Sequence, residues 1–174
     1  QGVQEAFATL ARELDVEEPK TPEDVYKSHL SETGGFKRGK EDKAATVESA
    51  RQNLASTFVN AFVNGGYGTD KLMTPEDSGW VHKNKEHGKI SATASLGLLM
   101  LWNVDEGLIK IDKFLYMSDD NVKAGALLAA GISNAGVRDE CESAHGLLPQ
   151  YMGKKADDGK DNSTTVRSAA ALGL

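Results

Sequence analysis

The carboxyl-terminal half of the chain repeats one small-residue pattern, and this repeat limits the fold more than any other feature does. Residues 89–98 read KISATASLGL and residues 123–132 read KAGALLAAGI, so Gly97 aligns with Gly131 at a spacing of 34 residues. A third copy covers residues 166–174 and is offset by 44 residues from the second. A period in the mid-thirties with helical segments is typical of a helical solenoid, whose units bury their apolar faces against each other.

Glycines inside the predicted helices indicate how closely these units pack. Gly97, Gly125 and Gly131 all lie in helix interiors, where each costs about 1 kcal/mol relative to alanine. A close approach of two helix backbones, which a larger side chain would block, compensates for that cost. We therefore predict an all-α fold, an α-solenoid of stacked helical hairpins.

Each small-residue helix is predicted to pair with an amphipathic partner. Leu108, Ile111 and Leu115 recur at steps of three and four residues, which predicts that they face inward. Pro149 is expected to end or bend its helix, because proline lacks the amide hydrogen that the helix needs. The predicted helices cover residues 85–102, 104–116, 122–133 and 139–151, and a third small-residue helix follows from 164, after a polar insert over 153–163.

The amino-terminal portion, residues 1–45, lacks the repeat. An amphipathic helix is predicted over residues 3–14, where apolar residues recur at helical spacing: Val3, Phe7, Leu10 and Leu14. A short helix is predicted from Thr21 to Leu30, because threonine, proline and acidic residues favour a helix start. Residues 31–45 are rich in glycine, lysine and serine and are predicted to form a flexible loop.

A long helix over residues 47–64 is predicted to open the second region, residues 46–174. Its apolar residues suggest one stripe that faces the core, formed by Leu54, Phe58, Ala61 and Phe62 and widened by Val59 and Val63. Gly65 and Gly66 end this helix. Residues 67–83 are predicted to be irregular. Both tryptophans, Trp80 and Trp102, are predicted to lie in the core.

Composition and charge exclude some classes of function. The chain has 174 residues and a net charge of −6, which argues against a nucleic-acid partner because phosphate binding needs a concentrated basic face. No apolar run is long enough to span a membrane. The single cysteine suits a reducing compartment. No cofactor is indicated. Because the chain begins without methionine and ends inside a repeat, we expect it to be a fragment.

Cys141 and His145 form the one candidate pair for metal or thiol chemistry. They lie four residues apart on a predicted helix, a spacing that can place two ligands on one metal ion. Two ligands are too few, however, and no oxyanion hole can be named for a nucleophile. A buried thiol and a surface imidazole are the favoured interpretation. A small helical thiol enzyme remains the alternative function from a different class.

Several strings of residues resemble a known family. Residues 123–140 resemble a proteasome/cyclosome repeat. Residues 49–64, 83–88 and 103–140 together resemble the large non-ATPase subunit of the 26S proteasome base, the subunit that docks ubiquitin-like domains, and the segment 18–30 also fits. The resemblance covers nearly the whole chain apart from the predicted loop and the polar insert. It implies a toroid of stacked helical hairpins in a subunit several times longer than this chain.

The resemblance also implies a role. Members of this family have no catalytic activity of their own; they hold ubiquitin receptors, shuttle factors and a deubiquitinase near the ATPase ring. The implied partners are therefore the ubiquitin-like domain of a deubiquitinase, the ATPase ring and other regulatory-particle subunits. The implied location is the cytoplasm and the nucleus. A related scaffold, either the second large non-ATPase subunit or a cyclosome subunit, is the closer alternative.

Within this family, residues 103–110 correspond to the docking site for the ubiquitin-like domain of the deubiquitinase. By position, Val104, Asp105 and Ile109 would be the contact residues, although Ile109 stands where a polar residue is expected. The site for ubiquitin and shuttle factors is expected to lie beyond Leu174.

The chemistry of these residues agrees with such a site. Ubiquitin-like domains present an apolar patch rimmed by lysine and arginine, so their partner needs an exposed apolar residue beside carboxylates. Val104 beside Asp105 and Glu106 provides this combination. Asp119 and Asp120 are expected to add to the negative electrostatic field at the site. The alternative interpretation is that these acids only stabilise helix amino termini.

Overall fold

The computed structural model describes residues 2–14, 17, 43–76, 78–138, 143–154 and 161–174, with the backbone alone over 43–49. Helices dominate this part of the chain, as the repeat predicts. They are α1 (Gly2–Glu13), α4 (Lys43–Val63), α5 (Trp80–Lys83), α6 (His87–Leu99), α7 (Val104–Leu115), α8 (Asp120–Ser133), α9 (Ser143–Leu147), α10 (Pro149–Met152) and α11 (Thr164–Gly173).

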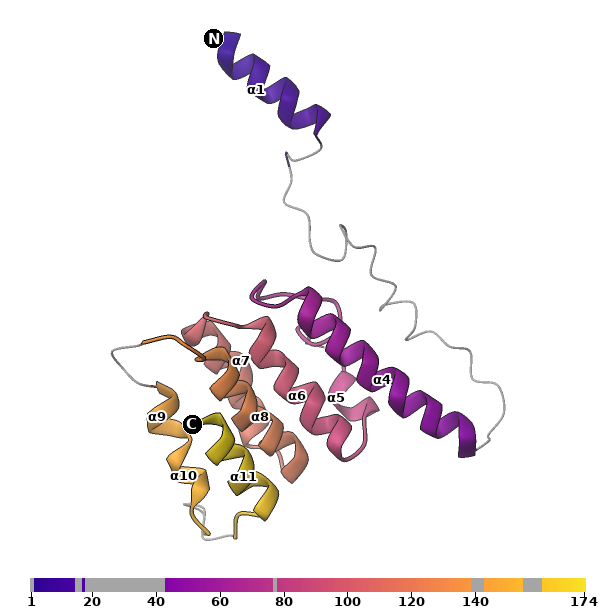
Figure 1. Ribbon diagram of the computed structural model, residues 1–174, viewed down its shortest axis with the longest axis vertical. Helices are drawn as coiled ribbons and strands as arrows, with labels where there is room; N and C mark the ends of the chain where they lie inside the picture. Colours follow the sequence, from indigo (N-terminus) through magenta and orange to yellow (C-terminus); the bar gives the residue numbers. More distant parts are fainter. Residues whose placement is uncertain (1, 15–16, 18–42, 77, 139–142, 155–160) are drawn as a thin grey trace.

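Four of these helices lie side by side in one row. Along the row, α4 packs against α6, α6 against α8, and α8 against α11 (Figure 1). The remaining helices of this body join the row from the side, because α5 packs on α6, α7 packs on both α6 and α8, and α10 packs on α11. This arrangement is the predicted solenoid of helical hairpins, with the small-residue helices α6, α8 and α11 forming adjacent members of the row.

The helix boundaries follow the sequence signals closely. The predicted helices over 3–14, 104–116 and 122–133 are confirmed as α1, α7 and α8, each within two residues at either end. Asp119 caps α8 by accepting a hydrogen bond from the Asn121 amide, and Ser163 caps α11 in the same way with Val166. The helix is interrupted before Pro149. This proline is the first residue of α10, a position at which the missing amide hydrogen costs no helical hydrogen bond.

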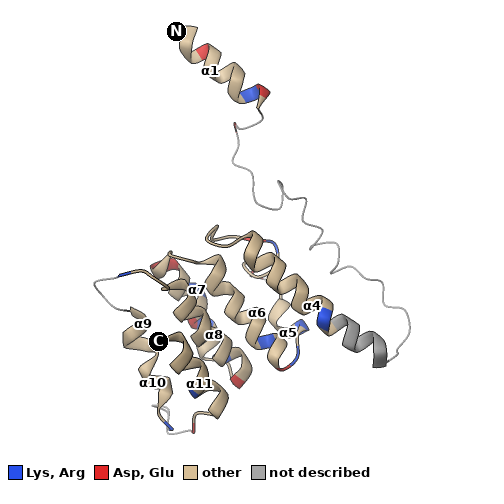
Figure 2. Ribbon diagram, in the orientation of Figure 1, with Lys and Arg blue, Asp and Glu red and all other residues tan. Residues whose placement is uncertain are grey.

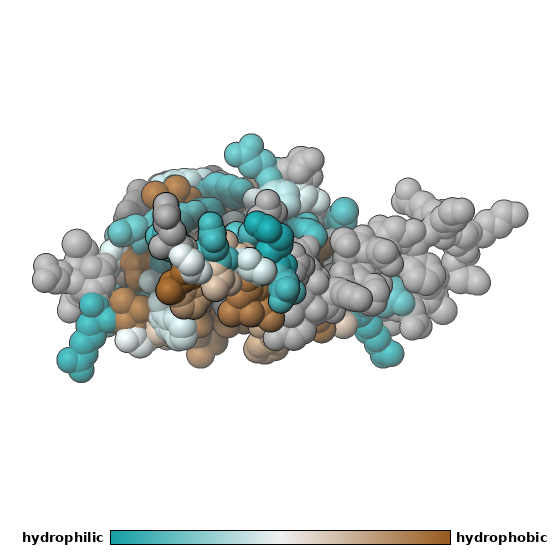
Figure 3. Space-filling model, turned by 90° about the horizontal axis from the view of Figure 1, so that it is seen from above, coloured by the Kyte–Doolittle hydropathy of each residue, from teal (hydrophilic) through white to brown (hydrophobic). Residues whose placement is uncertain are grey.

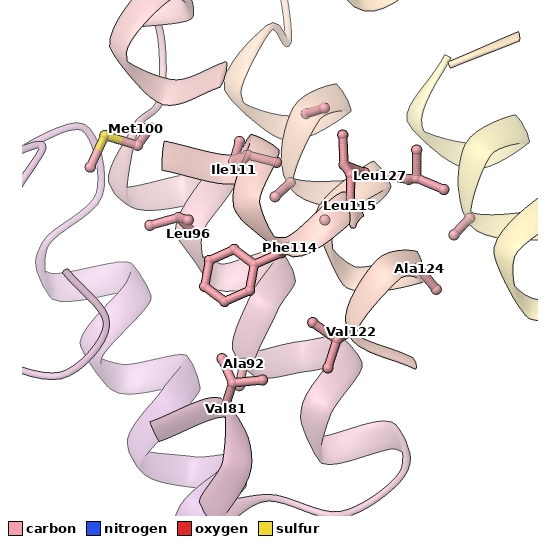
Figure 4. Close-up of a cluster of buried hydrophobic side chains, with 14 of the residues drawn as sticks. Val81, Ala92, Leu96, Met100, Ile111, Phe114, Leu115, Val122, Ala124 and Leu127 are labelled. Carbon is pink, nitrogen blue, oxygen red and sulfur yellow. The ribbon is translucent and has the colours of Figure 1, made fainter. Parts of the chain in front are cut away.

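The hydrophobic core lies between the row and the helices beside it. Leu99, Ile111 and Leu127 are almost completely buried, and they come from α6, α7 and α8 respectively. Figure 4 shows Phe114 of α7 among side chains from the neighbouring helices, with Leu96 of α6 beside it. The predicted inward residues Ile111 and Leu115 are confirmed as part of this core.

The glycines lie at backbone-to-backbone contacts, as predicted. A Cβ atom on Gly97 would lie 2.7 Å from the Cα of Ala129, and one on Gly125 would lie 2.6 Å from the carbonyl oxygen of Ile90. A Cβ on Gly131 would lie 2.5 Å from the Cα of Gly173. Real Cβ atoms essentially never approach so closely, so glycine alone fits these positions without a shift of the backbone.

Helix α4 corrects the prediction for its orientation. Phe58, Val59 and Phe62 are exposed, and Phe62 retains 73% of its accessible surface. The face that packs against α6 is instead polar or small, formed by Ser56, Thr57, Asn60, Ala61 and Asn64. Of the predicted stripe, Ala61 alone is buried. The prediction failed because it assumed that the more apolar face of a helix is always the inner one.

Hydrogen bonds explain why polar residues occupy the inner face of α4. The Trp80 indole nitrogen donates to the Thr57 hydroxyl at 2.9 Å, and the Asn60 amide donates to the Asp70 carboxylate at 2.6 Å. That carboxylate also accepts bonds from backbone amides over residues 72–74, including the Thr74 amide at 2.7 Å, and so orders the connection after α4. Buried polar groups are tolerated where such partners exist.

The two tryptophans differ in their placement. Trp80 is buried, as predicted, and anchors α5 to α4 through its bond to Thr57. Trp102 is exposed by 68%, so its assignment to the core is wrong. Its backbone is left-handed, with φ of 67°, and its amide donates to the Ser133 carbonyl at 3.0 Å. This turn directs the chain from α6 into α7 and leaves the indole ring outside.

Some predictions concern residues outside the described part of the chain. The short helix over 21–30, most of the loop over 31–45 and the start of the helix over 139–151 are among them. The predicted division after residue 45 falls inside α4, which begins at Lys43 instead of Val47. Within the described residues, every helix is too short or too polar to cross a membrane.

The glycine contacts lead to a prediction about stability. Gly97→Ala should lower the free energy of unfolding by about 3 kcal/mol, because α6 and α8 must separate to admit the methyl group. Gly146→Ala, in open space on α9, is the matched control and should be neutral or slightly stabilising. Urea denaturation of both variants measures the difference. Equal stability of the two variants would contradict the close-packing interpretation.

Candidate protein-docking surface

Helix α7 is the element that carries the predicted docking residues. Its inner face consists of Gly107, Ile111, Phe114 and Leu115, all buried against α6 and α8. Gly107 allows this contact, because a Cβ there would lie 3.0 Å from the Cβ of Met100. The packing of the inner face fixes which residues of α7 point outward.

The outward residues form a regular line that we call the α7 outer stripe: Asp105, Ile109, Asp112 and Tyr116. They follow each other at steps of four, three and four residues, which places them on one face of a helix. All four are exposed, and Ile109 and Tyr116 retain 75% and 80% of their surface. Apolar and acidic side chains therefore alternate along this stripe.

A small polar network fixes the amino terminus of α7. The Asn103 amide donates to the Glu106 carboxylate at 2.9 Å, and Lys110 forms an ion pair with the other oxygen of Glu106 at 2.9 Å. The hydrogen bond from Lys110, followed by that from Asn103, lowers the pKa of Glu106 below its ordinary value. Lys110 also donates to the Gly68 carbonyl at 3.2 Å, which ties α7 to the segment after α4. Glu106 is thus engaged within the chain, whereas Asp105 forms part of the stripe.

Val104 has a different position from the one expected. It lies on the core side of α7 and is half-buried, because it precedes Gly107 and Ile111 at helical spacing. The exposed apolar residue in the first half of α7 is instead Ile109. Exposed Trp102 precedes the helix by two residues and adds a second apolar group near its start.

Asp119 and Asp120 lie beyond the opposite end of α7, about 18 Å away along the helix axis. Figure 2 shows acidic residues at both ends, near the start of α7 and near the start of α8. Asp119 pairs with Lys89 at 2.5 Å and caps α8, while Asp120 is exposed in the first turn. The hydrogen bond from Lys89 lowers the pKa of Asp119, with a further contribution from the Asn121 amide. These two acids therefore do not join Asp105 in one cluster.

The arrangement favours contact with another protein over chemistry on a small molecule. Among the described residues, no three histidine, cysteine, aspartate or glutamate side chains gather closely enough to hold a metal ion. His145 is exposed in α9, and Cys141 lies outside the described residues. An exposed stripe with alternating apolar and acidic groups is suited to a partner with an apolar, basic surface.

Sequence reasoning missed Asp112, Tyr116 and Trp102. The first two could have been found, because they extend the spacing of Asp105 and Ile109 along the same helix face. Trp102 could not, since its exposure follows from a left-handed turn that no pattern in the sequence marks.

Comparison with known proteins agrees with the repeats and the fold. Residues 1–31 match the model of the RPN1 N-terminal domain. The chain is 53% identical over 145 residues, or 79% of its length, to the 26S proteasome non-ATPase regulatory subunit 2 homolog A of Arabidopsis thaliana. It is 44% identical over 171 residues, or 98% of its length, to the 26S proteasome non-ATPase regulatory subunit 2 of Dictyostelium discoideum.

A fungal relative shows the same degree of similarity. The chain is 53% identical over 140 residues to the 26S proteasome regulatory subunit rpn1 of Schizosaccharomyces pombe. The matched segments cover 16%, 17% and 15% of the length of these three relatives, in the order given. The chain thus corresponds to a small part of each of them.

The Lys89–Asp119 pair predicts a dependence of stability on pH. Because the folded-state pKa of Asp119 lies below its ordinary value of 3.8, the pair stabilises the fold at neutral pH. This stabilisation is lost as the pH falls through the lowered pKa. Lys89→Met should cost no more than about 1 kcal/mol at pH 7, since the pair is partly exposed.

Urea denaturation of both proteins across acidic pH measures this effect. The stability difference between wild type and Lys89→Met should begin to shrink as the pH falls below 3.8, the ordinary pKa of Asp119, and should be lost below its lowered folded-state pKa. A difference that stays constant down to the lowest measurable pH would show that ionisation of Asp119 does not contribute to it.

Proposed function

The chain belongs to the family of the 26S proteasome non-ATPase regulatory subunit 2, and we propose that it forms part of a non-catalytic docking scaffold in the regulatory particle. The similarity along 98% of the chain to a relative of that name supports this proposal. It also favours this subunit over the second large non-ATPase subunit and over a cyclosome subunit. The other regulatory-particle subunits, including the ATPase ring, are the proposed assembly partners, and the cytoplasm and nucleus are the proposed location.

The α7 outer stripe is the proposed docking site for the ubiquitin-like domain of a proteasome-associated deubiquitinase. The observation that supports this is the exposure of Ile109 and Tyr116 in register with Asp105 and Asp112. An apolar patch rimmed by lysine and arginine can cover the apolar residues while its cations approach the carboxylates. Ile109 then contributes apolar contact where the family resemblance suggests a polar one.

Helix α7 is held rigidly in the fold, which supports its choice as the docking site. The inner face of α7 is buried, and Asn103, Glu106 and Lys110 hold its amino terminus in place. A site built on a packed helix loses little conformational entropy when a partner binds. The solenoid can therefore present the stripe without rearrangement of its backbone.

Reversal of one charge tests this proposal. Asp105→Lys should weaken the binding of a deubiquitinase's ubiquitin-like domain about tenfold, because it places a cation against the basic rim of the partner. Isothermal titration calorimetry with the isolated ubiquitin-like domain measures the affinity. Circular dichroism should show that the variant remains folded, since Asp105 is exposed.

Asp120→Lys is the matched control, with the same change of charge at the opposite end of α7. It should weaken binding less than Asp105→Lys does, because Asp120 lies outside the α7 outer stripe, in the first turn of α8 beyond Tyr116. If both variants weaken binding equally, the partner responds to the net charge of the chain and the stripe is not the site. Unchanged affinity of Asp105→Lys would exclude the site directly.

A further inference from the structure

Two helices of this chain each expose an apolar stripe that no other described residue covers. The α1 stripe consists of Val3, Phe7, Leu10 and Leu14, and each of these residues retains about half of its surface or more. The α4 stripe consists of Ala55, Phe58, Val59 and Phe62, on the face opposite to the one that packs against α6. Figure 3 shows hydrophobic side chains at the surface of the molecule beside hydrophilic ones.

The position of α4 makes its exposed stripe unusual. Within the described row, α4 is the end helix and has α6 on one side only (Figure 1). The end of a solenoid needs a cap with a polar outer face, because no further unit covers it. Phe58 and Phe62 give α4 the opposite character, and no other described residue covers this face of α4.

Helix α1 also has an apolar face without a packing partner among the described residues. It has 12 residues, none of them buried, and a lone helix of this length is marginal in water. Its apolar residues follow steps of four, three and four residues and form one narrow stripe. The opposite face carries Glu5 and Arg12. A helix with this pattern gains stability only by covering its stripe, and it then presents charges to solvent.

The connection between the two helices is long enough for contact. The 28 residues 15–42 separate Leu14 from Lys43, and such a segment can span up to about 90 Å. Phe58 lies about 22 Å along α4 from its start. Because both stripes belong to one chain, their effective concentration is far above that of a second copy in solution.

We propose that the α1 stripe packs against the α4 stripe and covers the exposed face of the described row of helices. The occupant of the α4 face is therefore the amino-terminal helix of the same chain. This contact joins the segment that matches the N-terminal domain model, residues 1–31, to the first layer of the repeat region. It also accounts for the inverted polarity of α4, whose phenylalanines then lie between two helices.

Hydrogen–deuterium exchange on the full chain tests this contact. In wild type, amides of α1 should exchange at least about tenfold more slowly than in the Phe58→Asp/Phe62→Asp variant, because an undocked helix of this length opens readily. Amides of α6 and α8 should exchange equally in both proteins, which shows that the variant is folded. Tyr116→Asp is the control, since Tyr116 is an exposed aromatic residue at the end of another helix, α7.

Each outcome decides the proposal. Loss of α1 protection in the α4 variant alone, at two protein concentrations about tenfold apart, supports it. Fast exchange of α1 in wild type, or slow exchange that the α4 variant does not change, would overturn it. Protection that appears only at the higher concentration, together with a dimer in light scattering, would assign the α4 stripe to a second copy and also overturn it.

Discussion

The close approach of neighbouring helix backbones is the constraint on which the rest of this structure depends. Gly97 and Gly125 leave no room for a side chain between α6 and α8, and Gly131 does the same between α8 and α11. Contacts of this kind fix both the distance and the rotation of each helix, because ridges and grooves of the backbone must fit directly. The unfavourable helix propensity of each glycine is offset by the burial of small residues such as Ala92, Ala126 and Ala129 at the close contacts.

The fixed row determines where α7 can expose side chains. Once α6 and α8 are in contact, α7 has one face to bury, and its acidic and apolar residues at Asp105, Ile109, Asp112 and Tyr116 must point outward. The charge pattern of the sequence predicts that the carboxylate of Asp119 takes part in docking. In the structure, the ion pair between Lys89 and Asp119 joins the starts of α6 and α8. Asp119 therefore contributes to the stability of the fold, whereas Asp105 and Asp112 belong to the surface proposed for docking.

Helix α4 shows that the polarity of a helix face does not by itself decide which side is buried. Thr57 and Asn60 are buried because Trp80 and Asp70 provide hydrogen-bond partners, and a satisfied polar group carries little penalty. The buried Asn64 amide nitrogen donates to the carbonyl and side-chain oxygens of Asn60, whereas its own side-chain oxygen has no partner among the described residues. The phenylalanines on the opposite face then remain for another contact. An apolar stripe at the end of a row therefore indicates an additional layer, which the amphipathic α1 matches in length and pattern.

The sequence by itself determined the all-α class, the hairpin period and most helix boundaries, since spacing and helix caps are local signals. It also determined that the glycines lie at contacts, because nothing else compensates a glycine in a helix interior. Only the tertiary structure decided the orientation of α4, the exposure of Trp102 and the pairing of Asp119 with Lys89. These depend on partners distant in the chain: Trp80 and Asp70 for α4, the Ser133 carbonyl for Trp102, and Lys89 for Asp119.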